Sequence, residues 1–207
     1  MRIPESPWAL VGCRIGPWTM DGWTDGRMEC GGEVLADSLG PSLWPDLAAL
    51  IEANGHYAAS DPELPRGPEP RRRIALITCM DVRIPPLISL GLHLGDAHVL
   101  RNAGARVTED TLRSLAVSQQ ALGTDTVILM PHTLCGLTGL DPAGWEDRLP
   151  AVRAPMEFLA VADPVATCLE DLRTLAKNPW MRTGTRYLGL LFDVESGRVK
   201  VLGFHGG

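Results

Sequence analysis

Two apolar runs, each followed at once by reactive side chains, constrain the fold of this chain more than any other feature. Residues 74–77 are wholly apolar and lead into Cys79, and residues 127–130 are wholly apolar and lead into His132. Short continuous runs of this kind are typical of strands buried on both faces of a parallel sheet. Functional residues of such sheets gather beyond the carboxyl ends of the strands, so we expect Cys79 and His132 to lie close together.

Helical signals alternate with these strands along the chain. Thr108 is a good helix cap with two acidic residues after it, and Asp163 before Pro164 is another strong helix start. Residues 187–194 and 199–204 read as two strands of a terminal hairpin. The remaining expected elements are strands at 97–100 and 126–130, a short helix at 85–92, and helices at 108–123 and 163–178. This order predicts an α/β fold with a mainly parallel central β-sheet, flanking helices and an antiparallel edge strand.

The chain divides into two parts that differ in composition and in the periodicity of their apolar residues. Residues 1–44 hold four of the six tryptophans among scattered glycines and prolines, and they show no sustained period. We interpret them as an N-terminal arm of unknown role. The periodic part, 45–207, is predicted to be one catalytic domain, beginning with a helix from Pro45 to Gly55.

Composition excludes several classes of function. The formal net charge of −6 gives a nucleic-acid partner no electrostatic support, and no apolar run approaches the length of a membrane span. The amino terminus lacks the pattern of a signal peptide, and a cytoplasmic location is expected. An odd, sparse set of cysteines favours metal or catalytic use over a disulfide framework. These are Cys13, Cys30, Cys79, Cys135 and Cys168.

Cys79, His132 and Cys135 have the donor atoms of a zinc site. Thiolates and neutral imidazole are preferred zinc ligands, and three protein ligands leave the fourth tetrahedral position open, as in catalytic sites. His132 and Cys135 are three residues apart, so both can reach one ion from a turn. The sequence therefore predicts one catalytic Zn²⁺ per chain. Buried thiols with an ordinary packed histidine are the alternative, because this spacing alone is a weak signal.

Asp81 and Arg83 follow Cys79 on the same turn. An arginine two residues away can keep a carboxylate ionised and aimed. Beside zinc, this carboxylate can either accept a hydrogen bond from the nucleophile or occupy the open coordination position itself. An ordinary surface salt bridge after a strand is the simpler interpretation of the same pair.

Three motifs resemble those of the β-class carbonic anhydrases and occur in that family's order. The similarity runs from about Asn54 to Gly203, and it is greatest to the short bacterial members. In those members His98 stands where many others carry a pocket phenylalanine. Among the remaining histidines His98 is therefore the best candidate to touch the pocket, but an ordinary surface or packed histidine is the simpler interpretation. The motifs are Cys79-x-Asp81-x-Arg83, Arg101-Asn102-Ala103-Gly104 and His132-x-x-Cys135-Gly136.

The resemblance implies both an activity and an assembly. The implied zinc ligands are Cys79, His132 and Cys135. Asp81 and Arg83 would form the catalytic dyad, and the Gly136 N–H would help hold the bicarbonate oxygen. The implied reaction is zinc-dependent, reversible hydration of carbon dioxide to bicarbonate and a proton. The resemblance also implies a homodimer or homotetramer with a small-molecule substrate and no membrane or nucleic-acid partner.

Two other functions fit the same residues. Close relatives of the short branch hydrolyse carbonyl sulfide or carbon disulfide with the same ligands, and the metal-site residues do not discriminate between these substrates. A non-catalytic zinc or bicarbonate-sensing protein is the alternative from another class. A cysteine hydrolase is also conceivable, but such an enzyme would stay active after zinc removal.

Overall fold

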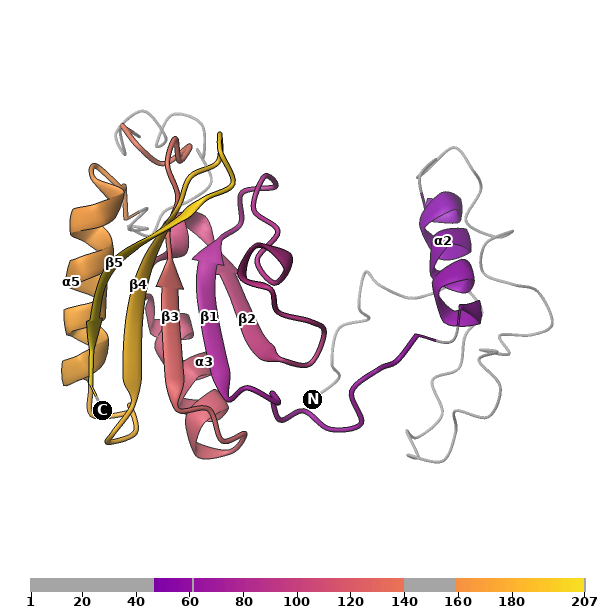
Figure 1. The fold of residues 1–207 in the computed structure, drawn as a ribbon, viewed down its shortest axis with the longest axis horizontal. Coiled ribbons are helices and arrows are strands. Elements are labelled where there is room, and N and C mark those ends of the chain that lie inside the picture. Colours follow the sequence, from indigo (N-terminus) through magenta and orange to yellow (C-terminus); the bar gives the residue numbers. More distant parts are fainter. Residues whose placement is uncertain (1–46, 61, 140–158, 207) are drawn as a thin grey trace, which may run out of the picture. The chain divides into compact units, whose positions relative to one another are not determined.

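The computed structural model describes residues 47–60, 62–139 and 159–206, which include one five-stranded sheet (Figure 1). The strand order is β2-β1-β3-β4-β5, with β1 to β4 parallel and β5 antiparallel at the edge. The strands are β1 (Ile74–Cys79), β2 (Ala97–Asn102), β3 (Thr126–Met130), β4 (Arg186–Phe192) and β5 (Val199–His205). The mainly parallel α/β sheet with an antiparallel edge strand, expected from the sequence, is confirmed.

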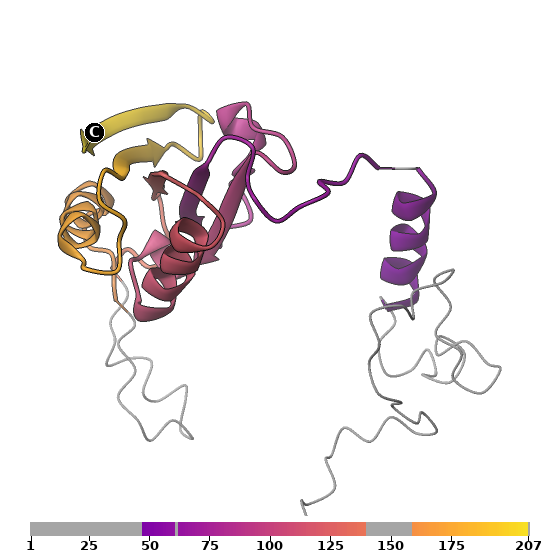
Figure 2. The ribbon, with the colours of Figure 1, turned by 90° about the horizontal axis from the view of Figure 1, so that it is seen from below.

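Two helices cover one face of the sheet (Figure 2). They are α3 (Glu109–Gln120) and α5 (Pro164–Lys177). Both begin at the expected caps: Thr108 accepts a hydrogen bond from the Thr111 N–H, and Asp163 accepts from two N–H groups of the first turn of α5. These side chains satisfy backbone donors that have no partner within the helix.

Two helix predictions differ from the structure. Helix α2 (Leu47–Ala59) continues through Gly55, which we expected to end it. One glycine inside a helix costs only about 1 kcal/mol relative to alanine, and the residues after it sustain the helix. The helix expected at 85–92 is reduced to the single 3₁₀ turn η1 (Ile88–Leu90), because it starts at two prolines and ends at Gly91, whose φ is 65°.

The sheet and α2 belong to different units of the chain. One unit ends at Glu63 and includes α2, and the other runs from Leu64 to Gly207 and contains the sheet. The predicted arm, 1–44, lies outside the described residues, so the division into arm and catalytic domain stays a prediction. None of the described helices combines the length and apolar character needed to cross a bilayer.

The core lies along the two central strands. The side chains of 75–77 in β1 and of 127 and 129–130 in β3 are fully buried, as expected for strands covered on both faces. The Thr78 hydroxyl donates to the Met130 carbonyl oxygen at 2.7 Å within this buried region. This bond fixes the carboxyl ends of β1 and β3 beside each other.

Asp125 ties three strands together at the opposite, amino edge of the sheet. Its carboxylate accepts hydrogen bonds from Arg73 Nε at 2.7 Å and from Arg186 Nη2 at 2.9 Å. Arg73 directly precedes β1, and Arg186 is the first residue of β4. Burial alone would raise the pKa of the Asp125 carboxyl, but hydrogen bonds from Arg186, Thr126 and Arg73 lower it below its ordinary value. The folded state therefore favours the ionised carboxylate.

We expect Asp125→Asn to destabilise the protein at neutral pH but not in acid. The carboxyl has a lower pKa when folded, so its contribution is complete above about pH 4 and disappears as pH falls through the folded-state value. Urea unfolding at pH 7 and pH 3 measures this difference in the free energy of unfolding. Asp110→Asn, in an exposed pair on α3, serves as the control. If Asp125→Asn lowered the free energy of unfolding equally at pH 7 and pH 3, the ionised carboxylate would not be the source of the stability.

Candidate metal centre

Three ligand-type side chains meet where β1 and β3 end. Cys79 is the last residue of β1, and His132 and Cys135 lie on the loop that follows β3. Their ligand atoms all lie within 4.8 Å of one another, and all three residues are buried. The parallel pairing of β1 with β3 brings the two motifs together, as the sequence predicts.

The His132 ring has one nitrogen engaged and one free to bind an ion. Its Nδ1 lies 2.8 Å from the Thr133 carbonyl oxygen, which can only accept, so Nδ1 carries the proton. In the neutral ring Nε2 presents the lone pair, and it has no hydrogen-bond partner within the described part of the chain, although the side chain is 1% exposed. An unpartnered buried nitrogen is costly, and a bound metal would satisfy it.

The loop that carries His132 and Cys135 is anchored to the end of β4. The Thr133 N–H donates to the Phe192 carbonyl at 2.9 Å, and its hydroxyl contacts Asp193 and accepts from the Val194 N–H. Leu134 has a φ of 52°, an uncommon conformation for a residue with a side chain. Residues more than fifty positions later in the sequence thus fix the shape of this turn.

The two thiols have different electrostatic surroundings. Burial alone would raise the pKa of Cys79, but His132 and the N–H groups of Asp81 and Gly104 lower it to about 7. For Cys135, burial and the neighbouring Cys79 raise the pKa of the thiol. Two thiolates at this distance repel each other, so both ionise together only if a cation lies between them.

Asp81 is held by Arg83 in a fixed orientation beside the cluster. Arg83 Nε and Nη2 donate to the two carboxylate oxygens at 2.9 and 2.7 Å, and the Arg83 N–H also donates to Oδ1 at 2.9 Å. These bonds hold the pKa of the Asp81 carboxyl well below its usual range. Asp81 Oδ2 lies 3.8 Å from His132 Nε2, so an ionised oxygen borders the cluster. Arg83 also donates to the Leu134 carbonyl at 2.9 Å, which links the two motifs.

Gly136 lies on the open side of the loop. It is exposed, and a Cβ added there would meet no atom of the described residues within 4 Å. Space for a small molecule therefore adjoins its backbone. Its expected contact with bicarbonate stays a prediction.

The motif Arg101-Asn102-Ala103-Gly104 supports the turn that follows Cys79, a role that the sequence alone did not indicate. The Arg101 side chain donates to the backbone carbonyl oxygens of Cys79 and Asp81 at 3.0 and 2.6 Å. The backbone carbonyl oxygen of Asn102 accepts from the Met80 N–H at 2.9 Å. The Gly104 N–H donates to Cys79 Sγ at 3.4 Å. The motif was visible in the sequence, but nothing in it indicated which backbone atoms it would contact.

His98 lies away from the cluster, as the simpler interpretation of an ordinary packed histidine predicts, and not as a residue of the pocket. His98 pairs with Ala75, whereas Cys79 pairs with Asn102, so His98 lies four strand positions before the end of β2. At about 3.3 Å per residue, this is roughly 13 Å along the strand. Both ring nitrogens of His98 are used elsewhere, by Ser118 and by the Pro68 carbonyl, each at 2.8 Å.

Comparison with known proteins agrees with this sheet and cluster. The family model described as "Carbonic anhydrase" matches residues 74–157. Beta-carbonic anhydrase 1 of Mycobacterium tuberculosis is 36% identical over 133 residues, which are 63% of this chain and 82% of that protein. A carbon disulfide hydrolase of Acidianus sp. is 31% identical over 156 residues, covering 62% of this chain and 76% of that protein.

Solved structures give the same result. A carbonic anhydrase from Streptococcus mutans superimposes with a TM-score of 0.71 at 36% identity, covering 76% of this chain and 98% of that one. The sheet and the Cys-His-Cys cluster define an α/β protein with a site able to hold a metal. With these relatives, the chain belongs to the β-class carbonic anhydrase family.

We expect Cys135→Ala to lose metal binding, because it removes one of the three ligand atoms. The loss of affinity should exceed the roughly 10–100-fold typical of losing an outer-shell partner. Metal content after dialysis, measured by mass spectrometry, tests this. Cys168→Ala removes a buried thiol whose pKa is raised to about 12 by burial and which lies on α5, outside the cluster. It should keep one metal per chain. A Cys135→Ala protein with full metal content would show that the ligand assignment is wrong.

Proposed function

We propose that the protein catalyses the zinc-dependent, reversible hydration of carbon dioxide to bicarbonate and a proton. Cys79, His132 and Cys135 would hold one Zn²⁺ per chain. The observation that carries the proposal is the buried His132 Nε2, which no group of the described residues hydrogen-bonds and which lies among two thiols and beside the carboxylate of Asp81.

Zinc is the metal that suits this donor set. Two sulfur atoms and one imidazole nitrogen match its preference, and a three-ligand site keeps one position open. When bound, zinc supplies the Lewis acidity that makes water nucleophilic near neutral pH. Family membership supports the same cofactor.

Asp81 would orient the nucleophile. Its ionised carboxylate can only accept, so it takes a hydrogen bond from the attacking water or hydroxide and directs a lone pair toward carbon. Arg83 occupies both carboxylate oxygens and aims Oδ2 at the cluster. The Gly136 N–H would donate to a bicarbonate oxygen. The released proton would then leave to buffer.

We expect Asp81→Asn to keep one zinc per chain while lowering turnover. The amide replaces an ionised acceptor without removing a ligand, and loss of orientation at a reacting centre costs about 10²-fold in rate. Stopped-flow hydration assays with parallel zinc analysis measure the two effects separately. Asp125→Asn, at the opposite edge of the sheet, should leave turnover unchanged at neutral pH. Wild-type turnover in Asp81→Asn would remove Asp81 from the mechanism.

The proposal as a whole is tested by zinc content together with carbon dioxide hydration, before and after chelation. One zinc per chain, with activity that disappears on chelation and returns with zinc, is the expected result. Activity that survives complete zinc removal would contradict the proposal. Zinc-loaded protein that turns over no substrate would favour the non-catalytic alternative.

Hydrolysis of carbon disulfide or carbonyl sulfide is a second candidate, favoured by the carbon disulfide hydrolases among the relatives. All three substrates are small, linear and electrophilic at carbon, so the same residues can serve each. Turnover of carbon dioxide, carbonyl sulfide and carbon disulfide by one preparation distinguishes them. Faster turnover of a sulfur substrate would reassign the activity without changing the metal site.

A second copy of the chain would cover the apolar residues that flank the site, giving a homodimer or homotetramer. Val82, next to Asp81, is 96% exposed, and Leu134, next to Cys135, is 63% exposed. Apolar side chains this exposed beside a functional site suit a protein interface. Light scattering coupled to size exclusion should give at least twice the mass of one chain.

A cytoplasmic location stays a prediction.

A further inference from the structure

The turn after β2 contains two consecutive residues in the left-handed region. Gly104 has a φ of 79°, and Ala105 has a φ of 56° although it carries a Cβ. A left-handed alanine is strained because its Cβ crowds the following carbonyl oxygen, and such strain persists only where the surrounding structure fixes it. Ala105 is 2% exposed, so this turn is held inside the protein.

The strained turn points a backbone donor at the candidate metal centre. The Gly104 N–H donates to Cys79 Sγ at 3.4 Å in a buried contact. A Cβ at position 104 would approach methyl groups of Leu137 and Val161 to 2.9 Å, so a larger residue would be strained in its backbone and would displace these side chains. The hydrogen bond to the sulfur thus comes from a turn with an unusual backbone and close packing.

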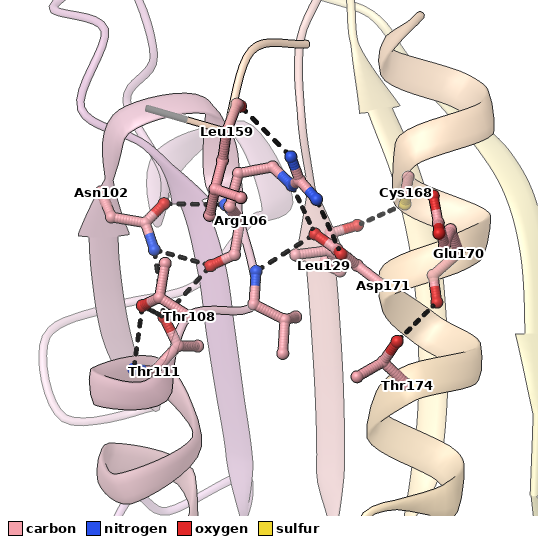
Figure 3. Close-up of polar contacts among 11 residues, drawn as sticks. Asn102, Arg106, Thr108, Thr111, Leu129, Leu159, Cys168, Glu170, Asp171 and Thr174 are labelled. Atoms are coloured by element: carbon pink, nitrogen blue, oxygen red, sulfur yellow. Dashed lines mark hydrogen bonds and ion pairs between the residues drawn. The ribbon is translucent and has the colours of Figure 1, made fainter. Parts of the chain in front are cut away.

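Asn102 closes the turn with its side chain (Figure 3). Its Oδ1 accepts from the Arg106 N–H at 2.8 Å, and its Nδ2 donates to the Arg106 carbonyl at 2.7 Å. Nδ2 also donates to the Thr111 hydroxyl at 3.0 Å. The Asn102 side chain thus joins the residue before the strained segment to Arg106 after it, and to Thr111 in the first turn of α3.

Arg106 fastens the turn to α5. Its Nε and Nη2 donate to the two oxygens of Asp171 at 2.8 and 3.2 Å, and Asp171 also accepts from the Val107 N–H at 3.1 Å (Figure 3). The arginine and aspartate side chains are only 15% and 8% exposed. A buried ion pair is weak evidence for stability, since apolar residues often serve as well, so a role in fixing one conformation is the better explanation.

We propose that Asn102, Arg106 and Asp171 are positioning residues for the metal centre. They hold the strained turn so that the Gly104 N–H donates to the sulfur of Cys79, and the inference rests on the proposed role of Cys79 as a metal ligand. The hydrogen bond fixes the sulfur where the ion binds and withdraws electron density from the thiolate. Partners of this kind, one step behind the ligands, tune both metal affinity and the metal–ligand bond.

The test compares Asn102→Ala with a matched control at the other edge of the sheet. Like the partly buried Asn102, Gln119 is an amide that joins distant parts of the chain: it is buried, donates to the Thr185 hydroxyl and accepts from the Arg182 N–H, and neither bond reaches the site. Gln119→Ala therefore reports the general effect of losing such an amide. Metal-free full-length chains are titrated with Co²⁺ against a chelator, and circular dichroism verifies that each is folded.

We expect Asn102→Ala to bind Co²⁺ about 10–100-fold more weakly than wild type, with Gln119→Ala within about threefold. The thiolate-to-Co²⁺ charge-transfer band of saturated Asn102→Ala should shift to longer wavelength, because a sulfur without its hydrogen bond gives up charge more readily. Unchanged affinity and band position in Asn102→Ala, or an equal loss in Gln119→Ala, would overturn the proposal.

Arg106→Lys keeps the test decisive if Asn102→Ala does not fold. Lysine retains the positive charge beside Asp171 but lacks the planar fork that reaches both oxygens. The same band shift is expected with a smaller loss of affinity, and an unshifted band with wild-type affinity would overturn the proposal.

The Co²⁺ titration also separates this inference from the proposed function. Wild type that binds Co²⁺ in the expected way but hydrates no carbon dioxide would refute only the function. Normal hydration with unaffected Co²⁺ binding in Asn102→Ala would refute only the positioning role.

Discussion

The parallel pairing of β1 with both β2 and β3 is the constraint on which the site depends. Cys79 ends β1, and the register places Asn102 of β2 beside it, while Thr78 pairs with Met130 of β3. The turn after β2 and the loop after β3 therefore emerge on either side of the cysteine. One supplies the N–H of Gly104, and the other supplies His132 and Cys135. A shift of one residue between these strands would turn Cys79 toward the opposite face of the sheet.

The geometry gathers groups that do not favour one another without a cation. Two thiols, an imidazole with a free lone pair and an ionised carboxylate lie together in a buried or partly buried space. The protein offsets this unfavourable arrangement with fixed donors: Arg83 on the carboxylate and backbone N–H groups on the sulfur. The fold thus keeps the site assembled, so little of the binding energy of a metal is used to order its ligands.

Much of the sheet and the cluster could be predicted from the sequence, because their signals are local. Continuous apolar runs mark β1 and β3, and capping residues mark the start of α3 and α5. The proximity of Cys79 and His132 followed from the rule that parallel strands end at one edge.

The sequence did not reveal the features that depend on distant backbone atoms. Nothing near His98 indicated that its ring would be held by Ser118 and the Pro68 carbonyl. The strained turn at Ala105 and its link to Asp171 were invisible for the same reason, because no local pattern demands a left-handed alanine. Helix α2 shows the reverse case: Gly55 is a local signal for the end of a helix, yet the helix continues to Ala59.

The anchoring of Thr133 by the end of β4 has a consequence for when the site can form. The loop that carries His132 takes its shape from the Phe192 carbonyl and the Asp193 side chain, which lie about sixty positions later in the sequence. During synthesis the earlier strands emerge first, and chains fold from the amino-terminal side. The histidine and second cysteine therefore acquire their final positions only after β4 and Asp193 have been synthesised. A metal captured by this cluster would therefore bind after the strands that shape its loop have folded, and would not nucleate them.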